Sequence, residues 1–383
     1  MLCYFIPNIS AGYSMKLNLL IVEDVQSITE QWKEKLEFYA IEDDKKYDII
    51  PTFASTLSKA QQLLHNTSFD VAVIDIRLDE GGEQTYNGNT ILENLSESSL
   101  TVCAIYTGEP GSEVIADYQK ELVKVFKKGD GDGIEKFLSW LDEKKEMISA
   151  IQTIQDSFNK SMARAFTHSI WPRWSYWLEN SEQKPTEKAL TRHMATHLHA
   201  TFLNNDEQGA HPEEYFFIPP LQEKLDTGDI ILKDGKLEII VTPRCDMLRT
   251  KSTTPTFQLV TLLDKKEEWE SLKYALRQRR EEGIEKKITG ALNNLKKFTN
   301  HNGETGSHFI QGFRIKIDGE EQSLGPYYAQ FNLLRSIERS EENIRDLLDC
   351  RIASLSNEFV PSLVERLGAY FSRIGTPDYS HPE

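Results

Sequence analysis

Short apolar runs recur along the N-terminal third of the chain, separated by segments in which apolar residues return every three to four positions. A run without polar alternation is typical of a strand buried on both faces of a parallel sheet. Parallel strands need crossover connections of helix length, so the pattern predicts a doubly wound α/β domain. The expected strands are Leu17–Val22, Tyr47–Ile50, Val71–Ile74, Thr101–Tyr106 and Leu122–Phe126, with helices over Ile28–Tyr39, Thr56–Leu64, Thr90–Leu95 and Glu113–Gln119.

Polar side chains follow four of the predicted strands. The acidic pair Glu23 and Asp24 comes after the first strand, and Asp75 comes after the third. Thr107 follows the fourth strand and Lys127 the fifth. The carboxyl ends of parallel strands meet at one edge of a sheet, which is where ligands bind in such folds. Crowded carboxylates repel one another unless a hard divalent cation neutralises them, so this edge is a predicted Mg²⁺ site.

This set of residues resembles the receiver domains of response regulators, the CheY-like family, over about a third of the chain. The resemblance implies a flavodoxin-like (βα)5 fold that promotes its own phosphorylation and dephosphorylation. It implies that Asp75 accepts a phosphoryl group from a histidine kinase or phosphotransfer protein, in the presence of Mg²⁺. By the same resemblance the phosphoryl group contacts Thr107 and Lys127, and the metal ligands are Glu23, Asp24, Asp75 and the backbone carbonyl of Arg77.

The sequence departs from the family pattern at three places. Lys128 competes with Lys127 for the phosphoryl-binding role, and Lys127 is preferred because it directly follows the apolar pair before it. The family often carries a Tyr or Phe three residues before that lysine, where this chain has Lys124. The stretch between Asp75 and Gly88 is longer and more acidic than usual and lacks proline. We expect the phosphorylation chemistry to be intact and the transmission of the signal to differ.

A long helix is predicted after the receiver. No Gly or Pro occurs from Ile134 to about Ala165. Apolar residues in this stretch fall on a heptad seam, which fits equally well a helix that pairs with a second copy or with the following domain, and an amphipathic helix packed within one chain. The seam consists of Leu141, Ile148, Ile151, Phe158, Met162 and Ala165. The expected organisation is a disordered leader over 1–14, a receiver over 15–140, a helical connector over 141–166 and an output domain over 167–383.

The C-terminal half predicts an α+β domain. Asp234-Gly235 reads as the turn of a hairpin. The sequence GDIILKDGKLEIIVTPRCDM is similar, over this one hairpin, to MazF/PemK-type toxins. The expected strands are 215–218, 230–232, 237–241, 257–263 and 308–317, with charged helices over 265–298 and a helical end over 327–373.

Candidate chemistry in this half is sparse. His193 and His197 share one face of a helix predicted over Thr186–Leu203, and Cys245 precedes Asp246. The aromatic cluster WPRWSYW is expected in a core or an interdomain contact. A helix-turn-helix, a P-loop and a nuclease spacing are not evident, so no firm catalytic motif is found. Three classes stay open: a non-standard output of a two-component system, an effector acting on nucleic acid in a defence or toxin role, and a scaffold.

Composition limits the partners and the compartment. The net charge is −16, and the region from Lys16 to Lys145 holds 14 basic and 25 acidic residues. Such a balance does not indicate nucleic-acid binding through phosphates. Four cysteines without a CxxC pair favour a reducing compartment. No apolar run reaches the roughly 18 residues that span a bilayer, so we expect a cytoplasmic protein.

Overall fold

The computed structural model describes residues 14–80, 83–115, 123–179, 186–203, 210–221, 223–248, 254–317 and 319–373. The chain divides into two compact units, Met1–Asn205 and Asp206–Glu383. The division therefore falls well beyond residue 166, where the predicted connector ends. The predicted leader lies outside the described residues except for residue 14.

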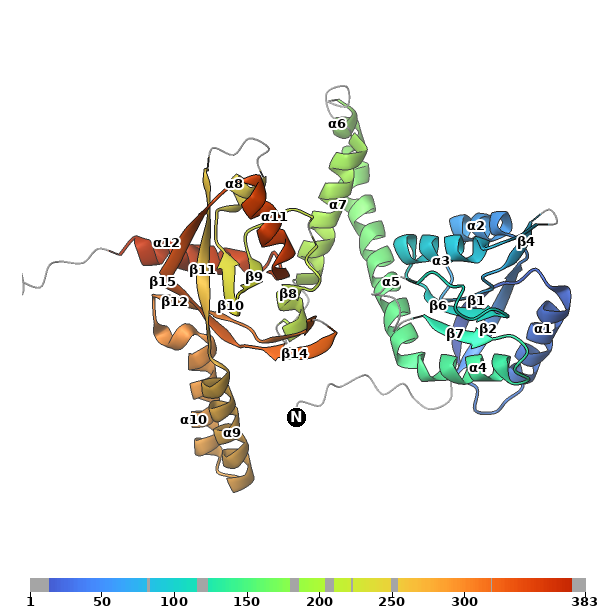
Figure 1. Ribbon diagram of the computed structural model, residues 1–383, viewed down its shortest axis with the longest axis horizontal. Helices are drawn as coiled ribbons and strands as arrows, with labels where there is room; N and C mark the ends of the chain where they lie inside the picture. The colour runs from blue at the N-terminus through green and yellow to red at the C-terminus, as the bar shows by residue number, and fades with distance from the viewer. Residues whose placement is uncertain are drawn as a thin grey trace, which may run out of the picture. The chain divides into compact units, whose positions relative to one another are not determined.

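A parallel five-stranded sheet forms the centre of the N-terminal unit (Figure 1). The sheet order β2-β1-β3-β6-β7 is that of the flavodoxin-like fold, which confirms the predicted fold class. All five predicted strands are present, but the last begins and ends later than its apolar run. The strands are β1 (Met15–Val22), β2 (Tyr47–Ala54), β3 (Val71–Ile74), β6 (Val102–Thr107) and β7 (Lys124–Lys127).

Helices cover both faces of this sheet, which explains the continuous apolar runs. Successive side chains of a strand point to opposite faces. Leu19 and Ile21 of β1 therefore pack on one face, and Leu20 and Val22 pack on the other. The first face is covered by α1 (Gln26–Ala40) and α4 (Gly133–Glu143), the second by α2 (Leu57–Asn66) and α3 (Asn87–Ser98).

The long segment after Asp75 contains a small hairpin, β4 (Leu78–Glu80) with β5 (Glu83–Thr85). The segment returns to the neighbourhood of Asp75 at Gly88, whose N–H donates to the carbonyl of Ile76 at 3.1 Å. A Cβ atom at Gly88 would collide with the backbone carbonyl of Asp75, so this close approach requires glycine. The predicted helix Glu113–Gln119 is not formed at residues 113–115, and its remainder lies outside the described residues.

The predicted uninterrupted connector helix is wrong, because the helix breaks at Lys144. Helix α4 ends at Glu143, and α5 (Lys145–Ala165) begins after Lys144, whose φ of −88° and ψ of 3° leave the helical region. Leu141 and Ile148, on either side of the break, are both buried in the core of the N-terminal sheet domain. The start of the heptad seam thus packs on the sheet domain, and the chain must bend to achieve this.

A helical hairpin completes the N-terminal unit. After α5 the chain passes through η2 (Phe166–Ile170), η3 (Trp171–Arg173) and α6 (Trp174–Leu178) into α7 (Thr186–Leu203), whose bounds confirm the prediction. Helices α5 and α7 lie side by side, with the rings of Phe158 and Phe202 5.0 Å apart. Trp171 is 64% exposed, so the aromatic cluster does not form a core of this unit.

A seven-stranded sheet forms the centre of the C-terminal unit, in the order β12-β15-β11-β10-β9-β16-β8. The predicted hairpin is confirmed: β9 pairs with β10 antiparallel, and Asp234 and Gly235 turn it with positive φ angles. The strands are β8 (Phe216–Phe217), β9 (Asp229–Lys233), β10 (Lys236–Ile240), β11 (Thr256–Asp264), β12 (Ser307–Ile310), β15 (Tyr327–Glu338) and β16 (Arg351–Leu355). The helices are α8 (Arg244–Leu248), α9 (Lys266–Glu282), α10 (Glu285–Thr299), α11 (Glu341–Asp349) and α12 (Val360–Phe371).

Two predictions for this unit are corrected. The end of the chain is not all helical: β15 is a twelve-residue strand and β16 a second strand, with α11 between them. Both strands pair on two sides within the sheet, and this pairing overrides local helical spacing. The predicted strand 308–317 is two strands, β12 and β13 (Phe313–Ile317), because β13 leaves the main sheet to pair with β14 (Glu320–Leu324).

No helix in the described part of the chain is long and apolar enough to cross a membrane.

Candidate functional site at the carboxyl edge of the parallel sheet

Three carboxylates meet where β1 and β3 end. Glu23 and Asp24 follow β1, and Asp75 follows β3, its N–H donating to the carbonyl of Val22 at 2.9 Å. One oxygen from each of the three side chains lies within 4.8 Å of the other two. Glu23 and Asp75 are only 4% and 5% exposed. Because these groups are hard oxygen donors that converge out of bulk water, the set fits a Mg²⁺ ion.

Lys128, and not the predicted Lys127, supplies the ammonium of this site. Lys128 Nζ lies 2.6 Å from Asp75 Oδ2 and 2.6 Å from Glu23 Oε2. Strand β7 runs one residue further than its apolar run, with Lys127 paired opposite Thr107. Lys127 is therefore the last strand residue and is exposed, whereas Lys128 follows the strand and enters the site.

Burial and the Lys128 ammonium have opposite effects on the pKa values of Glu23 and Asp75. Burial raises the pKa of Glu23 to about 7, although the Lys128 ammonium acts to lower it. Burial also raises the pKa of Asp75, again against Lys128. For Lys128, burial by itself lowers the pKa, but Glu23 and Asp75 together raise it above its ordinary value. Two buried carboxylates thus share one buried cation, an arrangement that a second cation would stabilise.

Thr107 and Arg77 complete the surroundings of Asp75. Thr107 is 1% exposed, and its Oγ1 accepts a hydrogen bond from the N–H of Glu109 at 3.3 Å. The N–H of Lys128 donates to the Thr107 carbonyl at 2.8 Å, which joins the two strand ends. Arg77 donates its N–H to Asp75 Oδ1 at 3.3 Å, so its backbone lies beside the Asp75 carboxylate.

The Arg77 side chain turns towards the rim of the site. Its guanidinium pairs with Glu109 and lies 5.6 Å from the ring centre of Tyr86. The loop after β3 and the loop after β6 are thereby joined beside Asp75.

The position three residues before the site lysine, where the family often has an aromatic residue, is not aromatic here whether it is counted from Lys127 or from Lys128. Counted from Lys127 it is Lys124, which is exposed, and counted from Lys128 it is Val125. The nearest aromatic along the neighbouring strand, Tyr106, is buried with its ring 5.4 Å from Trp32. It packs in the core of the domain.

The other predicted candidates do not gather into one site within a unit. His193 and His197 lie on α7, with ring centres 4.7 Å apart, and His193 packs against Trp177. Cys245 and Asp246 lie on α8 of the C-terminal unit, where Cys245 is exposed. Among the described residues, the acidic triad is the only cluster of three or more metal-binding side chains.

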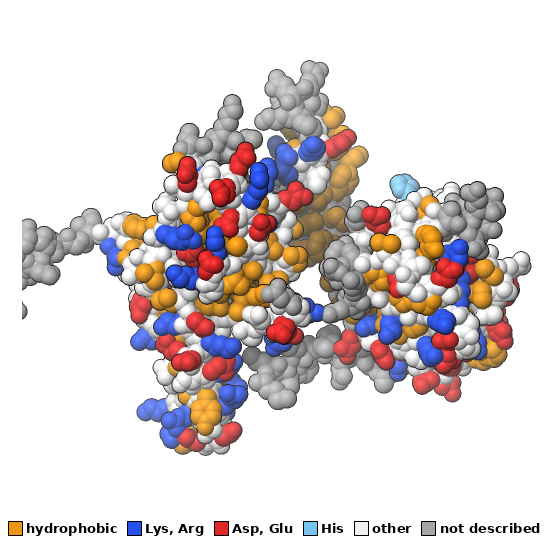
Figure 2. All heavy atoms as spheres, in the orientation of Figure 1, with side chains coloured by type: hydrophobic (Ala, Val, Ile, Leu, Met, Phe, Trp, Pro, Cys, Tyr) orange, Lys and Arg blue, Asp and Glu red, His pale blue; other side chains and the backbone are white. Residues whose placement is uncertain are grey.

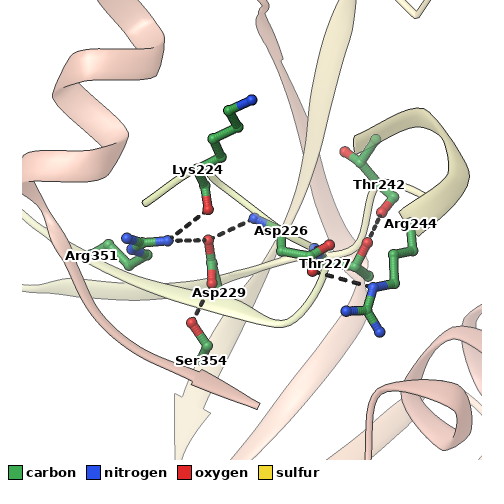
Figure 3. A network of polar contacts seen from close by, with 8 residues as sticks. All are labelled: Lys224, Asp226, Thr227, Asp229, Thr242, Arg244, Arg351 and Ser354. Carbon is green, nitrogen blue, oxygen red and sulfur yellow. Dashed lines mark hydrogen bonds and ion pairs between the residues drawn. The ribbon is translucent and has the colours of Figure 1, made fainter. Parts of the chain in front are cut away.

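A buried polar network in the C-terminal unit was missed from the sequence (Figure 3). Asp229, 1% exposed, pairs with Arg351 at 3.2 Å and accepts a hydrogen bond from Ser354. Burial raises the pKa of Asp229, while Ser354 and Arg351 act to lower it. The sequence does carry a signal, because Asp229 is a charged residue directly before the apolar run Ile230–Leu232 of β9.

The network continues to the segment before β9. The N–H of Asp226 donates to Asp229 Oδ2 at 2.8 Å, and Thr227 Oγ1 donates to the carbonyl of Thr242 at 2.5 Å. Arg244 Nε lies 3.2 Å from Asp226 Oδ2 (Figure 3). These contacts tie β9, β16 and the end of β10 together, which indicates a structural role.

Part of the chain is similar to solved structures of receiver domains. No protein-family model and no curated protein matches the chain. A CheY-like receiver domain from Methylobacillus flagellatus is 20% identical, with a TM-score of 0.25, covering 33% of this chain and 98% of that one. One from Methanospirillum hungatei JF-1 is 20% identical, with a TM-score of 0.26, covering 36% and 98%. The Francisella response regulator 1452 receiver domain is 19% identical, with a TM-score of 0.25, covering 34% and 95%.

These matches span about a third of the chain. By its own strand order, the N-terminal sheet domain has the flavodoxin-like fold. In that fold the chain is similar to CheY-like response-regulator receiver domains.

Proposed function

We propose that the protein is a response regulator of a two-component system, and that Asp75 accepts a phosphoryl group from a histidine kinase or phosphotransfer protein. The observation that carries this proposal is the convergence of Glu23, Asp24, Asp75 and Lys128 at the carboxyl edge of the sheet. Two of the three carboxylates, Glu23 and Asp75, contact the Lys128 ammonium, and all three lie close enough together to share one metal ion.

In this proposal an oxygen of the Asp75 carboxylate attacks phosphorus, and a P–O bond forms as the P–N bond to the donor histidine breaks. The released imidazole nitrogen keeps the bonding electron pair. Lys128 already contacts Asp75 Oδ2, so its ammonium is placed to bind a phosphoryl oxygen after transfer. The Thr107 hydroxyl, buried one strand away, is the second donor of the site.

Mg²⁺ would be held by Glu23, Asp24, Asp75 and the backbone carbonyl of Arg77. When bound, the ion neutralises phosphoryl oxygens as the two anionic groups approach. The protein's own contribution is to keep the carboxylate oriented. The N–H of Arg77 fixes Oδ1, and Lys128 fixes Oδ2.

The remainder of the chain is the output in this proposal. It comprises the α5–α7 hairpin and the mixed helix and sheet unit from Asp206 onwards. Helix α5 begins in the receiver core at Ile148, so it is physically continuous with the acceptor domain.

The proposal predicts that beryllofluoride with Mg²⁺ binds the wild-type protein and not Asp75→Ala. Acetyl phosphate should likewise add one acid-stable, base-labile phosphoryl group to the wild type alone. Intact-mass spectrometry measures the adduct, and fluorine NMR measures beryllofluoride binding.

Asp48→Ala is the matched control, because Asp48 is an exposed carboxylate on β2 of the same sheet. It should bind like the wild type. Equal phosphorylation of Asp75→Ala and wild type, or no adduct on either, would contradict the proposal.

A further inference from the structure

The α5–α7 hairpin carries a stripe of large apolar side chains that the described chain leaves uncovered. Ile154, Phe158, Met162 and Phe166 recur every four residues and are 48%, 43%, 37% and 42% exposed. Four-residue spacing places them on one side of the helix. Small side chains at Ser157, Ser161 and Ala165, partly buried, lie beside this stripe.

Helix α7 needs more cover than α5 alone provides. It has eighteen residues and none of them is fully buried. Its apolar residues Leu190, Met194, Leu198 and Phe202 are spaced four positions apart and are half-buried. An isolated helix of this length is marginal in water, because most helical stability in proteins comes from packing an apolar face. Beyond the first turns of α5, which pack on the sheet domain, the pairing of α5 with α7 leaves apolar side chains of both helices partly exposed.

The apolar surface extends past the end of α5. The ring of Phe166 lies 5.7 Å from that of Trp171, which continues the stripe towards α6. Figure 2 shows hydrophobic side chains gathered over the hairpin. The further exposed members are Trp171, Trp174, Tyr176, Leu178 and Leu203, between 40% and 64% exposed.

We propose that this hairpin is the homodimer interface, in which two copies of the chain pair their α5–α7 hairpins into a four-helix bundle. Two antiparallel helices from each copy make up the standard bundle, with the apolar stripes inside. An isologous two-fold contact needs one self-complementary patch, and an uncharged apolar stripe is self-complementary.

The size of the surface favours a second copy over a short peptide. A large side chain buries about 200 Å² when it is fully covered. The stripe and the further exposed members named above are each about half exposed, so together they offer a partner on the order of 800 Å². This is about what each partner contributes to a standard protein interface. The stripe residues themselves carry no charge to favour an ionic partner, and the ion pair of Lys160 with Asp156 on the same helix is exposed.

The test is the mass of the full-length chain in solution, measured by analytical ultracentrifugation without any phosphodonor. The wild type should sediment at twice the 44.0 kDa of one chain. Phe158→Glu combined with Met162→Glu should raise the dissociation constant at least about tenfold, because it places charges inside the bundle. Phe158→Gln, a milder change, should weaken the dimer in the same direction.

Ile41→Glu is the matched control, since Ile41 is 78% exposed on the receiver, at the end of α1. It should leave the dimer intact. A monomeric wild type would overturn the proposal. This holds whether the stripe is then covered by the C-terminal unit or binds lipid vesicles. So would a double-Glu variant that is folded by circular dichroism and still dimeric. Beryllofluoride binding is scored separately, so failure of the dimer and failure of the acceptor site are distinguishable.

Discussion

The ammonium beside Asp75 comes from the second of two adjacent lysines. Lys128 contacts Glu23 and Asp75, whereas Lys127 ends β7 and faces solvent. The residue types of the site could be predicted from the sequence, and so could the carboxylates that meet. The choice between the lysines could not, because it depends on where a strand of four residues stops.

This difference predicts opposite outcomes for two neighbouring substitutions. Lys128→Ala should slow phosphorylation of Asp75 by acetyl phosphate on the order of 100-fold, the usual cost of removing one charge-stabilising donor. Lys127→Ala should stay within about twofold of wild type, because Lys127 is exposed and it is Lys128 that contacts Glu23 and Asp75. Initial rates of adduct formation by mass spectrometry measure both.

The two variants control each other, since each removes one lysine and keeps the net charge equal. If both variants lost the same phosphorylation rate, or if Lys127→Ala lost more, the role proposed for Lys128 would be contradicted.

At the level of elements, the strands and helices of the N-terminal sheet domain follow from the spacing of their apolar residues and from the burial of both faces of the sheet. Leu19 and Leu20 point to opposite covered faces, which is why β1 is a continuous apolar run. The elements that were predicted wrongly are those whose conformation depends on contacts with distant parts of the chain. The break at Lys144 lets Leu141 and Ile148 both reach the receiver core, and local propensity does not encode that demand. Strand β15 reads as helical by spacing and becomes extended only because it has sheet partners on both sides.

The β9–β16 pair provides a test at this scale. Asp229→Ala should destabilise the C-terminal unit by about 3 kcal/mol, because it leaves the nearly buried Arg351 without its carboxylate. Hydrogen exchange of the β9 and β16 amides as a function of urea measures the loss.

Asp346→Ala removes the carboxylate of a half-exposed ion pair with Lys233 in the same unit. Exposed pairs contribute little, so the expected cost is below about 1 kcal/mol. If the two variants lost the same stability, the buried network would not be what holds β9 to β16.

For the molecule as a whole, the two units are expected to respond differently to acid, because the C-terminal unit holds the buried His308 and the partly buried His301. Burial, with His301 and Arg366 acting in the same direction, lowers the pKa of His308 to about 3, and burial together with Arg366 lowers that of His301 to about 4. The two rings stack 5.0 Å apart. In the unfolded chain these groups titrate near 6.5, so below that pH only the unfolded state takes up the protons.

Stability of the C-terminal unit should therefore fall as the pH drops below about 6.5. The loss due to His308 should reach about 2 kcal/mol at pH 5. Urea unfolding followed by hydrogen exchange at β12 and β15, between pH 7 and 5, measures it. His308→Gln should flatten this dependence, and an unchanged slope in that variant would contradict the assignment.

The anchoring of α5 has a consequence for communication along the chain. Gln152 donates to the carbonyl of Lys16 and to Asp70 Oδ1, both at 2.9 Å, at the beginnings of β1 and β3. Asp75 follows the other end of β3, roughly 20 Å away at about 3.3 Å per residue. Helix α5 is thus bound to the amino-terminal edge of the sheet, and if Asp75 is phosphorylated as proposed, we expect the signal to pass to α5 along the length of the strands.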